Sequence, residues 1–153
     1  MQPFYATLID RFHELHGEII KTLDELPAEA LDWQPAEGMN SISVLVVHLT
    51  GAERYWIGDV VLGEPSNRDR AAEFQVRGLD AGGLKQRVLD LDAYEKAGFE
   101  NMRLAYMEAQ CISPRDGRLF LAAWAVMHAL EHTALHVGHI QVQSQLWKQR
   151  GRG

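Results

Sequence analysis

Four of the seven histidines lie in one stretch near the end of the chain, LFLAAWAVMHALEHTALHVGHIQVQSQLWKQ, residues 119–149. They are His128, His132, His136 and His139, and they are spaced by four, four and three residues. At about 100° per residue, a single α-helix would project all four on a stripe less than a quarter-turn wide. Imidazole is the commonest metal-binding side chain, and an i, i+4 pair faces a common point. The spacing therefore indicates a site for a first-row divalent metal.

A structural or surface cluster of histidines is the plainer alternative. A single histidine on an apolar helix face is more often a core residue than a ligand. Burying four imidazoles without partners, however, would cost about 1–3 kcal/mol for each unsatisfied group. A further histidine, His48, lies inside the apolar run SISVLVVHLTGAERYW. It would also be assigned to the core, unless it meets the later cluster.

The apolar residues recur at a spacing of three or four along four long segments, which predicts four helices. These are residues 3–25, residues 41–62, residues 84–107 and residues 119–149. The second segment contains the β-branched run VLVV, which alone could form a strand. Its length and the N-capping side chains at Asn40 and Ser41 favour a helix instead. We therefore predict an all-α fold, an antiparallel four-helix bundle with long crossover connections.

The connectors between these helices differ in length. Residues 27–40 carry two prolines and a glycine, and residues 109–118 are expected to form a loop. Residues 64–83 are long for a bundle loop, and loops of this length tend to be lids or packed crossovers. Phe74 and Val76 are expected to anchor this connector to the bundle. His16, in the first helix, is expected to lie at the solvated boundary.

The bulk properties fit one globular domain, residues 1–153, with 46% hydrophobic and 24% charged residues. The formal net charge of −6 argues against a nucleic-acid surface. The first residues lack a signal-peptide pattern, and no run approaches the ~18 apolar residues of a membrane span. Cys111 is the single cysteine, which excludes an internal disulfide and fits a reducing cytoplasm.

Three imidazoles from two helices, His48 and two from the last segment, would leave positions open on a metal ion. Zinc sites with three protein ligands and a water are typical of catalysis, and such a water can reach a pKa of about 7. A thiolate can occupy the same position, because soft sulfur binds zinc well. The group would thus supply a nucleophile near neutral pH.

A competing motif overlaps this stretch. The sequence His128-Ala-Leu-Glu131-His132 matches the H-x-x-E-H pattern of inverted zinc peptidases, in which Glu131 would be the general base. The pattern is short and the region is rich in histidine, so a chance match is expected. No further element of such a protease is evident in the sequence, and Glu131 is expected to face the flank of the bundle.

Three stretches resemble the DinB superfamily of four-helix metalloproteins, which includes thiol-dependent transferases and isomerases. LDWQPAEGMNSISVLVVHLTGAERYW, residues 31–56, resembles the family's entry into its second helix. GEPSNRDRAAEF, residues 63–74, resembles its linker. HALEHTALHVGHIQ, residues 128–141, is similar to its H-x-x-x-H-x-G-Q signature. Together the resemblance covers the whole chain and implies the same four-helix fold.

Carried over residue by residue, the family's metal triad falls on His48, His132 and His136. The resemblance implies that Gly138 permits close helix packing. His139 stands where the family often has glutamine, so it is a candidate fourth ligand, hydrogen-bond donor or substrate contact.

Two further residues are candidates for the surroundings of the site. His128, one turn before His132, is a candidate for the same roles as His139. Glu53 falls near an acidic position of the family, five residues after the helix-two histidine. It would either orient a ligand imidazole, as carboxylates commonly do, or be a surface charge.

The resemblance implies a cytoplasmic enzyme that uses Zn2+ or Ni2+ for thiol S-transfer or hydrolysis of a small molecule. A bound low-molecular-weight thiol or water would be deprotonated and would attack an electrophile. Two alternatives stay open: a non-catalytic metal-binding bundle with a structural ion, and an interaction module with an empty pocket. The resemblance also implies a homodimer, and we expect it to bind neither nucleic acid nor membrane.

Overall fold

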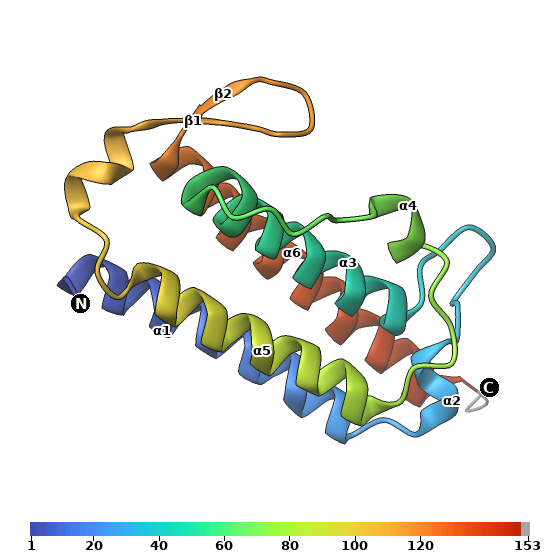
Figure 1. Ribbon diagram of the computed structural model, residues 1–153. Coiled ribbons are helices and arrows are strands. Elements are labelled where there is room, and N and C mark those ends of the chain that lie inside the picture. Colours follow the sequence, from blue (N-terminus) through green and yellow to red (C-terminus); the bar gives the residue numbers. More distant parts are fainter. Residues whose placement is uncertain (151–153) are drawn as a thin grey trace.

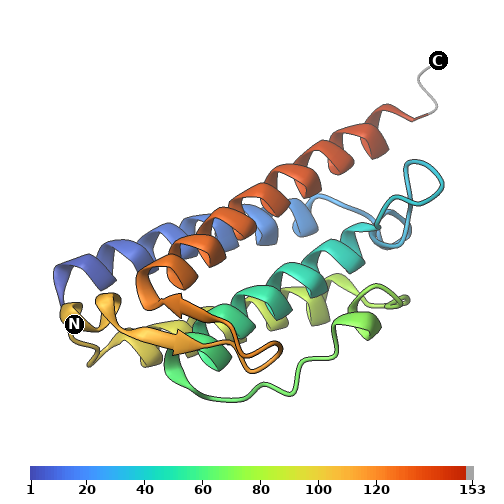
Figure 2. The ribbon, with the colours of Figure 1, turned by 90° about the horizontal axis from the view of Figure 1, so that it is seen from above.

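The computed structural model describes residues 1–150, and its four long helices pack into a bundle (Figures 1 and 2). Helices α1 and α6 run in one direction and α3 and α5 in the other. The chain therefore has to return along the bundle between α3 and α5. The expected all-α four-helix bundle with a long crossover connection is confirmed. The elements in chain order are α1 Pro3–Asp24, α2 Ala28–Leu31, α3 Ile42–Arg54, the π-helical η1 Tyr55–Leu62, α4 Arg70–Glu73, α5 Ala81–Phe99, the 3₁₀ turn η2 Leu104–Glu108, β1 Gln110–Ile112, β2 Leu119–Leu121 and α6 Ala122–Gln149.

Helix α3 is buried along almost its whole length, since only Gly51 and Arg54 among its residues escape burial. Its N-terminus is capped by Ser41, whose hydroxyl oxygen accepts a hydrogen bond from the backbone N–H of Val44 at 3.2 Å. Helices α5 and α6 pack against it, and the crossover runs along it (Figure 2). This all-round burial explains why the β-branched run is helical, because tertiary packing overrides a local strand preference.

The apolar core falls into two clusters, one toward the β-hairpin and one toward α2. Along α1, for example, Phe12 belongs to the first cluster and Ile19 to the second. Between them lies His16, which is only 2% exposed. The prediction that His16 is a boundary residue is therefore wrong, because hydrogen bonds to acidic side chains allow it to be buried.

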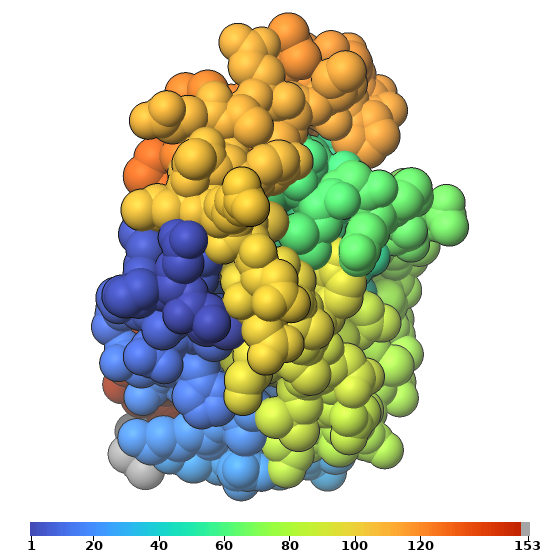
Figure 3. Space-filling model, turned by 60° about the vertical axis from the view of Figure 1, so that its left-hand side comes forward, coloured from blue at the N-terminus to red at the C-terminus, as the bar shows by residue number. Residues whose placement is uncertain are grey.

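Helix α5, the third of the four predicted helices, ends earlier than its apolar residues predicted, at Phe99 instead of residue 107. The next segment crosses the end of the bundle beside the start of α1, as Figure 3 shows in gold against blue. There the Tyr5 hydroxyl donates to the carbonyl of Arg103 at 3.0 Å. The backbone N–H of Leu104 donates to the side-chain oxygen of Gln2 at 2.9 Å. These contacts hold the segment across the bundle end, which helical periodicity alone could not indicate.

A β-hairpin replaces the predicted loop before α6, so the last helix begins at Ala122 and not at residue 119. Cys111 pairs with Phe120 in the antiparallel ladder, and both side chains face the apolar cluster at this end. The crossover also contains the short helix α4, and α5 begins at Ala81, with Asp80 as its N-cap. No helix within residues 1–150 combines the length and apolar character that crossing a membrane requires.

The buried aromatic ring of Phe12 provides a test of the core. Phe12→Ala removes a fully buried side chain, so we expect a loss of about 3–5 kcal/mol in the free energy of unfolding. Phe4→Ala, on the same helix but 46% exposed, is the matched control and should change stability by less than about 0.5 kcal/mol. Urea titration monitored by circular dichroism measures both. Equal losses in the two variants would contradict the assigned core face of α1.

Candidate metal centre

Packing of α3 against α6 brings together three histidines that are far apart in the sequence. His48 comes from α3, and His132 and His136 come from successive turns of α6. One ring nitrogen from each lies within 4.8 Å of those of the other two. The His48 ring centroid is 5.2 Å from that of His132 and 5.1 Å from that of His136. The structure thus assembles the three residues to which the resemblance assigned the metal.

The spacing of the two α6 histidines fits a shared ion. Nε2 of His132 and Nε2 of His136 are 3.2 Å apart. With metal–nitrogen bonds of about 2.0–2.1 Å, two ligands of one ion are separated by about 2.9 Å at a right angle and about 3.4 Å at a tetrahedral angle. The observed separation lies between these values. The two imidazoles are therefore close enough to direct their lone pairs at one point.

Burial keeps these imidazoles neutral. The pKa of His132 is lowered to about 3, first by burial and then by the neighbouring His136 and His48. The pKa of His136 is lowered to about 4, first by burial and then by His48 and His139. At neutral pH both rings are therefore unprotonated on one nitrogen, as a metal ligand must be.

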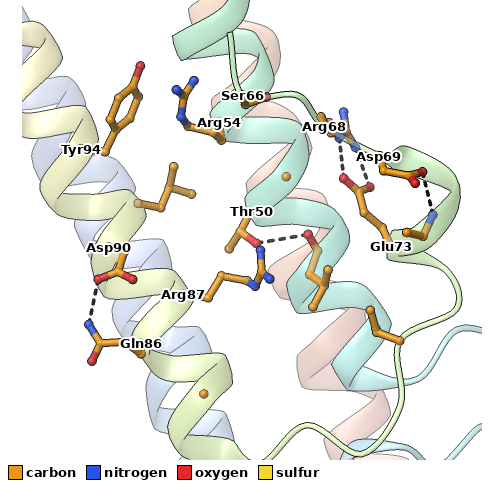
Figure 4. A pocket seen from close by; sticks show the side chains of 16 residues that line it. Thr50, Arg54, Ser66, Arg68, Asp69, Glu73, Gln86, Arg87, Asp90 and Tyr94 are labelled. Atoms are coloured by element: carbon orange, nitrogen blue, oxygen red, sulfur yellow. Dashed lines mark hydrogen bonds and ion pairs between the residues drawn. The ribbon is translucent and has the colours of Figure 1, made fainter. Parts of the chain in front are cut away.

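His48 is held by a carboxylate from the crossover. Its Nδ1 lies 2.9 Å from Oε2 of Glu73, to which it donates when Nδ1 carries the proton. Arg68 in turn donates to both oxygens of Glu73, at 2.5 and 2.8 Å (Figure 4). Burial alone raises the pKa of Glu73, but the hydrogen bonds from Arg68 and His48 outweigh it and lower that pKa below its ordinary value. A charged Glu73 thus orients His48 so that Nε2 is left free as a ligand, an arrangement typical of metal-binding histidines.

Glu73 and Arg68 were not predicted as site residues. The residue that could have indicated a helix here is Asp69. Its carboxylate accepts a hydrogen bond from the backbone N–H of Ala72 at 3.0 Å and caps the N-terminus of α4. This short helix turns Glu73 toward His48 and places the ring of Phe74 against it, with centroids 4.8 Å apart. The expectation that Phe74 anchors the crossover agrees with this contact.

A glycine on α3 makes room for this support. A Cβ atom at Gly51 would collide with the carboxylate of Glu73. Gly138, by contrast, has no neighbouring atom within 4 Å of a Cβ built on it. The predicted close packing at Gly138 is therefore wrong, and the close approach occurs at Gly51.

The two other histidines of α6 lie beside the group of three without joining it. The ring of His128 stacks on that of Trp124, with centroids 4.8 Å apart, and meets Trp56 edge-on at 4.9 Å. Its centroid is 6.1 Å from that of His132. His139 is exposed, and its centroid is 5.4 Å from that of His136. His128 thus borders the site through an aromatic cluster, and His139 lies on its solvent side.

The two acidic residues singled out in the sequence lie elsewhere. Glu53 is completely buried, so it is not a surface charge, and its hydrogen bonds go to His16 and Thr133 instead of the three histidines. Glu53 is therefore neither a surface charge nor a hydrogen-bond partner of the three histidines. Glu131 is exposed, as expected, on the flank of the bundle.

A cavity of about 830 Å3 lies between α3, α5 and the crossover. Figure 4 shows Thr50 and Arg54 on one wall and Arg87 and Tyr94 on another. None of the three histidines lines it, whereas Glu73, which binds His48, does. The cavity therefore adjoins the histidines through the carboxylate that supports them.

Comparison with known proteins identifies the family and the fold. A model described as the DinB superfamily matches residues 11–140, and among curated proteins no sequence matches the chain.

A conserved protein from Enterococcus faecalis superposes with a TM-score of 0.79 at 11% identity, covering 95% of this chain and 98% of that chain. YfiT from Bacillus subtilis, described as a probable metal-dependent hydrolase with an unusual four-helix bundle topology, gives 0.75 at 14%, covering 95% and 89%. A mycothiol-dependent maleylpyruvate isomerase gives 0.61 at 13%, covering 90% and 62%. Identities this low establish a shared fold alone.

The role of Glu73 can be tested without touching a ligand. Glu73→Gln keeps the size of the side chain but removes the charge that orients His48, so we expect metal affinity to fall about 10- to 100-fold. Glu131→Gln, an exposed acid beside His132, is the matched control and should leave affinity unchanged. Competition with a chromophoric chelator measures both. Unchanged metal affinity in Glu73→Gln would contradict the role of Glu73 in orienting His48 for the metal.

The lowered pKa values of His132 and His136 predict a pH dependence in metal-free protein. An unfolded chain protonates histidine near pH 6.5, whereas these folded-state pKa values are about 3 and about 4. As the pH falls from about 7 to about 4, the unfolded state therefore gains protons that the folded state does not, and stability decreases. Melting temperatures of a His132→Asn/His136→Asn variant should fall less over this range than those of wild type. Parallel pH profiles would show that these rings are not held neutral.

Proposed function

The chain belongs to the DinB superfamily. From this premise we propose that it is an enzyme whose active centre is a divalent ion, Zn2+ or Ni2+, held by His48, His132 and His136. Its reaction is thiol S-transfer or hydrolysis of a small molecule. A bound ion of this kind supplies Lewis acidity, which lowers the pKa of a coordinated thiol or water. The observation that carries the proposal is the convergence of three ring nitrogens within 4.8 Å.

The surroundings of the three rings support a catalytic ion over a structural one. Structural zinc sites are closed by four protein ligands, whereas catalytic sites keep a position open. At this site, among the residues that the structure describes, three histidines are grouped and no fourth protein donor joins them. His128 packs against Trp124 and Trp56, and His139 faces solvent. A structural ion, the alternative, would require His139 to turn inward and close the shell.

Different residues of the chain would bind the ion, orient its ligands and contact the substrate. Burial keeps His132 and His136 in the neutral, ligating form. Glu73 fixes the orientation of His48, and Arg68 keeps Glu73 charged. Trp124, which is exposed and lies against His128 and the buried Trp56, offers apolar surface to a small organic substrate.

The substrate class follows from open coordination positions beside apolar surface. For thiol S-transfer, the reactants would be a low-molecular-weight thiol and an electrophilic small molecule. For hydrolysis, they would be water and a hydrolysable small molecule. The isomerase that shares this fold depends on mycothiol, and YfiT is described as a probable hydrolase. Both chemistries need a nucleophile generated at neutral pH, which the three-histidine ion would provide.

We further propose that the protein acts as a cytoplasmic homodimer. The outward face of α6 exposes large apolar side chains along most of the helix, and a second copy of the chain would cover them. These side chains are Met127, Leu135, Val142 and Leu146. The cytoplasmic setting rests on the single cysteine, Cys111, which is buried and free.

Metal analysis tests the proposed function. Zinc-loaded His132→Ala should contain one ion per chain less than wild type, whereas His139→Ala, an exposed neighbour on the same helix, should retain the wild-type content. Elemental analysis after gel filtration gives both numbers. Equal metal content in His132→Ala and wild type would refute the three-histidine site.

Chelation separates the catalytic from the structural ion. A panel of small thiols with electrophilic or hydrolysable substrates should show turnover that is lost on chelation and restored by added Zn2+ or Ni2+. A chelator that only lowers the melting temperature, with no substrate turned over before or after, would favour the structural alternative.

A further inference from the structure

A polar layer crosses the bundle where its two apolar clusters meet, and each long helix contributes one residue to it. These residues are His16 of α1, Glu53 of α3, Glu95 of α5 and Thr133 of α6. Their side chains are at most 2% exposed. The neighbouring core positions on the same helices are apolar; on α5, for example, they are Leu91 and Phe99. An apolar side chain would also fit the pattern at position 95, so packing alone does not explain an acid there.

Hydrogen bonds account for most of this layer. Nε2 of His16 lies 2.8 Å from Oε1 of Glu53, and its Nδ1 lies 3.0 Å from Oδ1 of Asp92. The hydroxyl of Thr133 donates to the other oxygen of Glu53. Burial by itself lowers the pKa of His16, but Glu53 and Asp92 outweigh it and raise that pKa above its ordinary value. His16 and Glu53 are therefore paired, as buried polar groups must be.

Glu95 is the exception. Both of its carboxyl oxygens are buried, and neither has a hydrogen-bond partner among the residues that the structure describes. Burial, and then the adjacent Glu53, raise the pKa of Glu95 well above its ordinary value. Burying a carboxyl group without a partner costs several kcal/mol. Such a group in the middle of the core points to a ligand.

We propose that His16, Glu53 and Glu95 form a second divalent metal site, distinct from the three-histidine centre. One ligand atom from each lies within 4.8 Å of those of the other two. One imidazole nitrogen with two carboxylates is a harder donor set than three imidazoles and suits Mn2+ or Fe2+. The two carboxylates also match the charge of a divalent cation, which would make their burial together tolerable.

Side chains around these three residues hold two of them in place by hydrogen bonds. Asp92 accepts from Nδ1–H of His16, as Glu73 does for His48, and Nε2 of His16, which lies 2.8 Å from Glu53, would release its proton on binding the ion. Thr133 holds the second oxygen of Glu53. The half-buried Asp92 also lies 3.1 Å from Nδ1 of the exposed His13, so the hydrogen bonds that support His16 extend to the surface.

The competing account is a proton in place of the ion. A protonated Glu95 would donate a hydrogen bond to Glu53, and the layer would then be a purely structural network. Glu95→Gln separates the two accounts. The amide keeps the size and donates an N–H, as the protonated acid does, but it is neutral and cannot replace a carboxylate ligand.

The experiment measures Mn2+ binding in a His132→Ala background, in which the three-histidine centre is disabled. Equilibrium dialysis of metal-free protein, with elemental analysis and Mn2+ electron paramagnetic resonance, should find one Mn2+ per chain. Adding Glu95→Gln should abolish this binding. Adding Glu100→Gln instead, an exposed acid at the C-cap of the same helix, should leave it at one per chain.

Loss of Mn2+ binding in Glu95→Gln but not in Glu100→Gln supports the site. Absence of binding in folded His132→Ala, or binding that survives Glu95→Gln, overturns it, and neither result affects the three-histidine centre. Should Glu95→Gln fail to fold, wild-type crystals soaked in Mn2+ decide the question. An anomalous peak between His16, Glu53 and Glu95 is expected, and its absence at saturating Mn2+ refutes the site.

Discussion

The contact between α3 and α6 is the one on which the rest of the structure depends. It places the ring of His48 about 5 Å from those of His132 and His136, although more than eighty residues of sequence separate His48 from His132. The crossover then packs Phe74 and Glu73 onto the same His48 ring. Because Gly51 leaves room for that carboxylate, backbone, crossover and imidazole form one unit. A shift of α3 along α6 would move all of these contacts together.

Polar groups in the core reduce the apolar burial that this bundle could achieve. The core divides into two apolar clusters, and a layer of buried hydrogen-bonding side chains lies between them. Most members of the layer are paired, so their burial is tolerated, but Glu95 has no partner within residues 1–150. The three-histidine group shows the same feature, because Nδ1 of His132 and Nδ1 of His136 are also buried without one in that range. Four of the five buried side-chain atoms without a partner in residues 1–150 thus belong to the two donor groups, and the fifth is Oδ1 of Asp32, as expected of a bundle that gives up some stability for a site.

The sequence predicted the features that depend on local periodicity. The helical spacing of apolar residues indicated the four helices, and the motif residues His48, His132 and His136 lie together as the resemblance implied. Features set by contacts between distant segments were missed. The segment after Phe99 kept a helical pattern but is held across the bundle end by Tyr5. His16 gave no sign of its partner Glu53, because a lone histidine in a helix pattern does not reveal an acid on another helix.

X-ray absorption spectroscopy of protein loaded with less than one equivalent of Zn2+ tests the central claim most directly. The account predicts a first shell with three imidazole nitrogens at about 2.0–2.1 Å and the multiple-scattering pattern of histidine rings. The same pattern should weaken by one ring in a His48→Ala variant, because His48 is the ligand that α3 contributes. A shell made of carboxylate or water oxygens alone, or one unchanged in His48→Ala, would contradict the assignment.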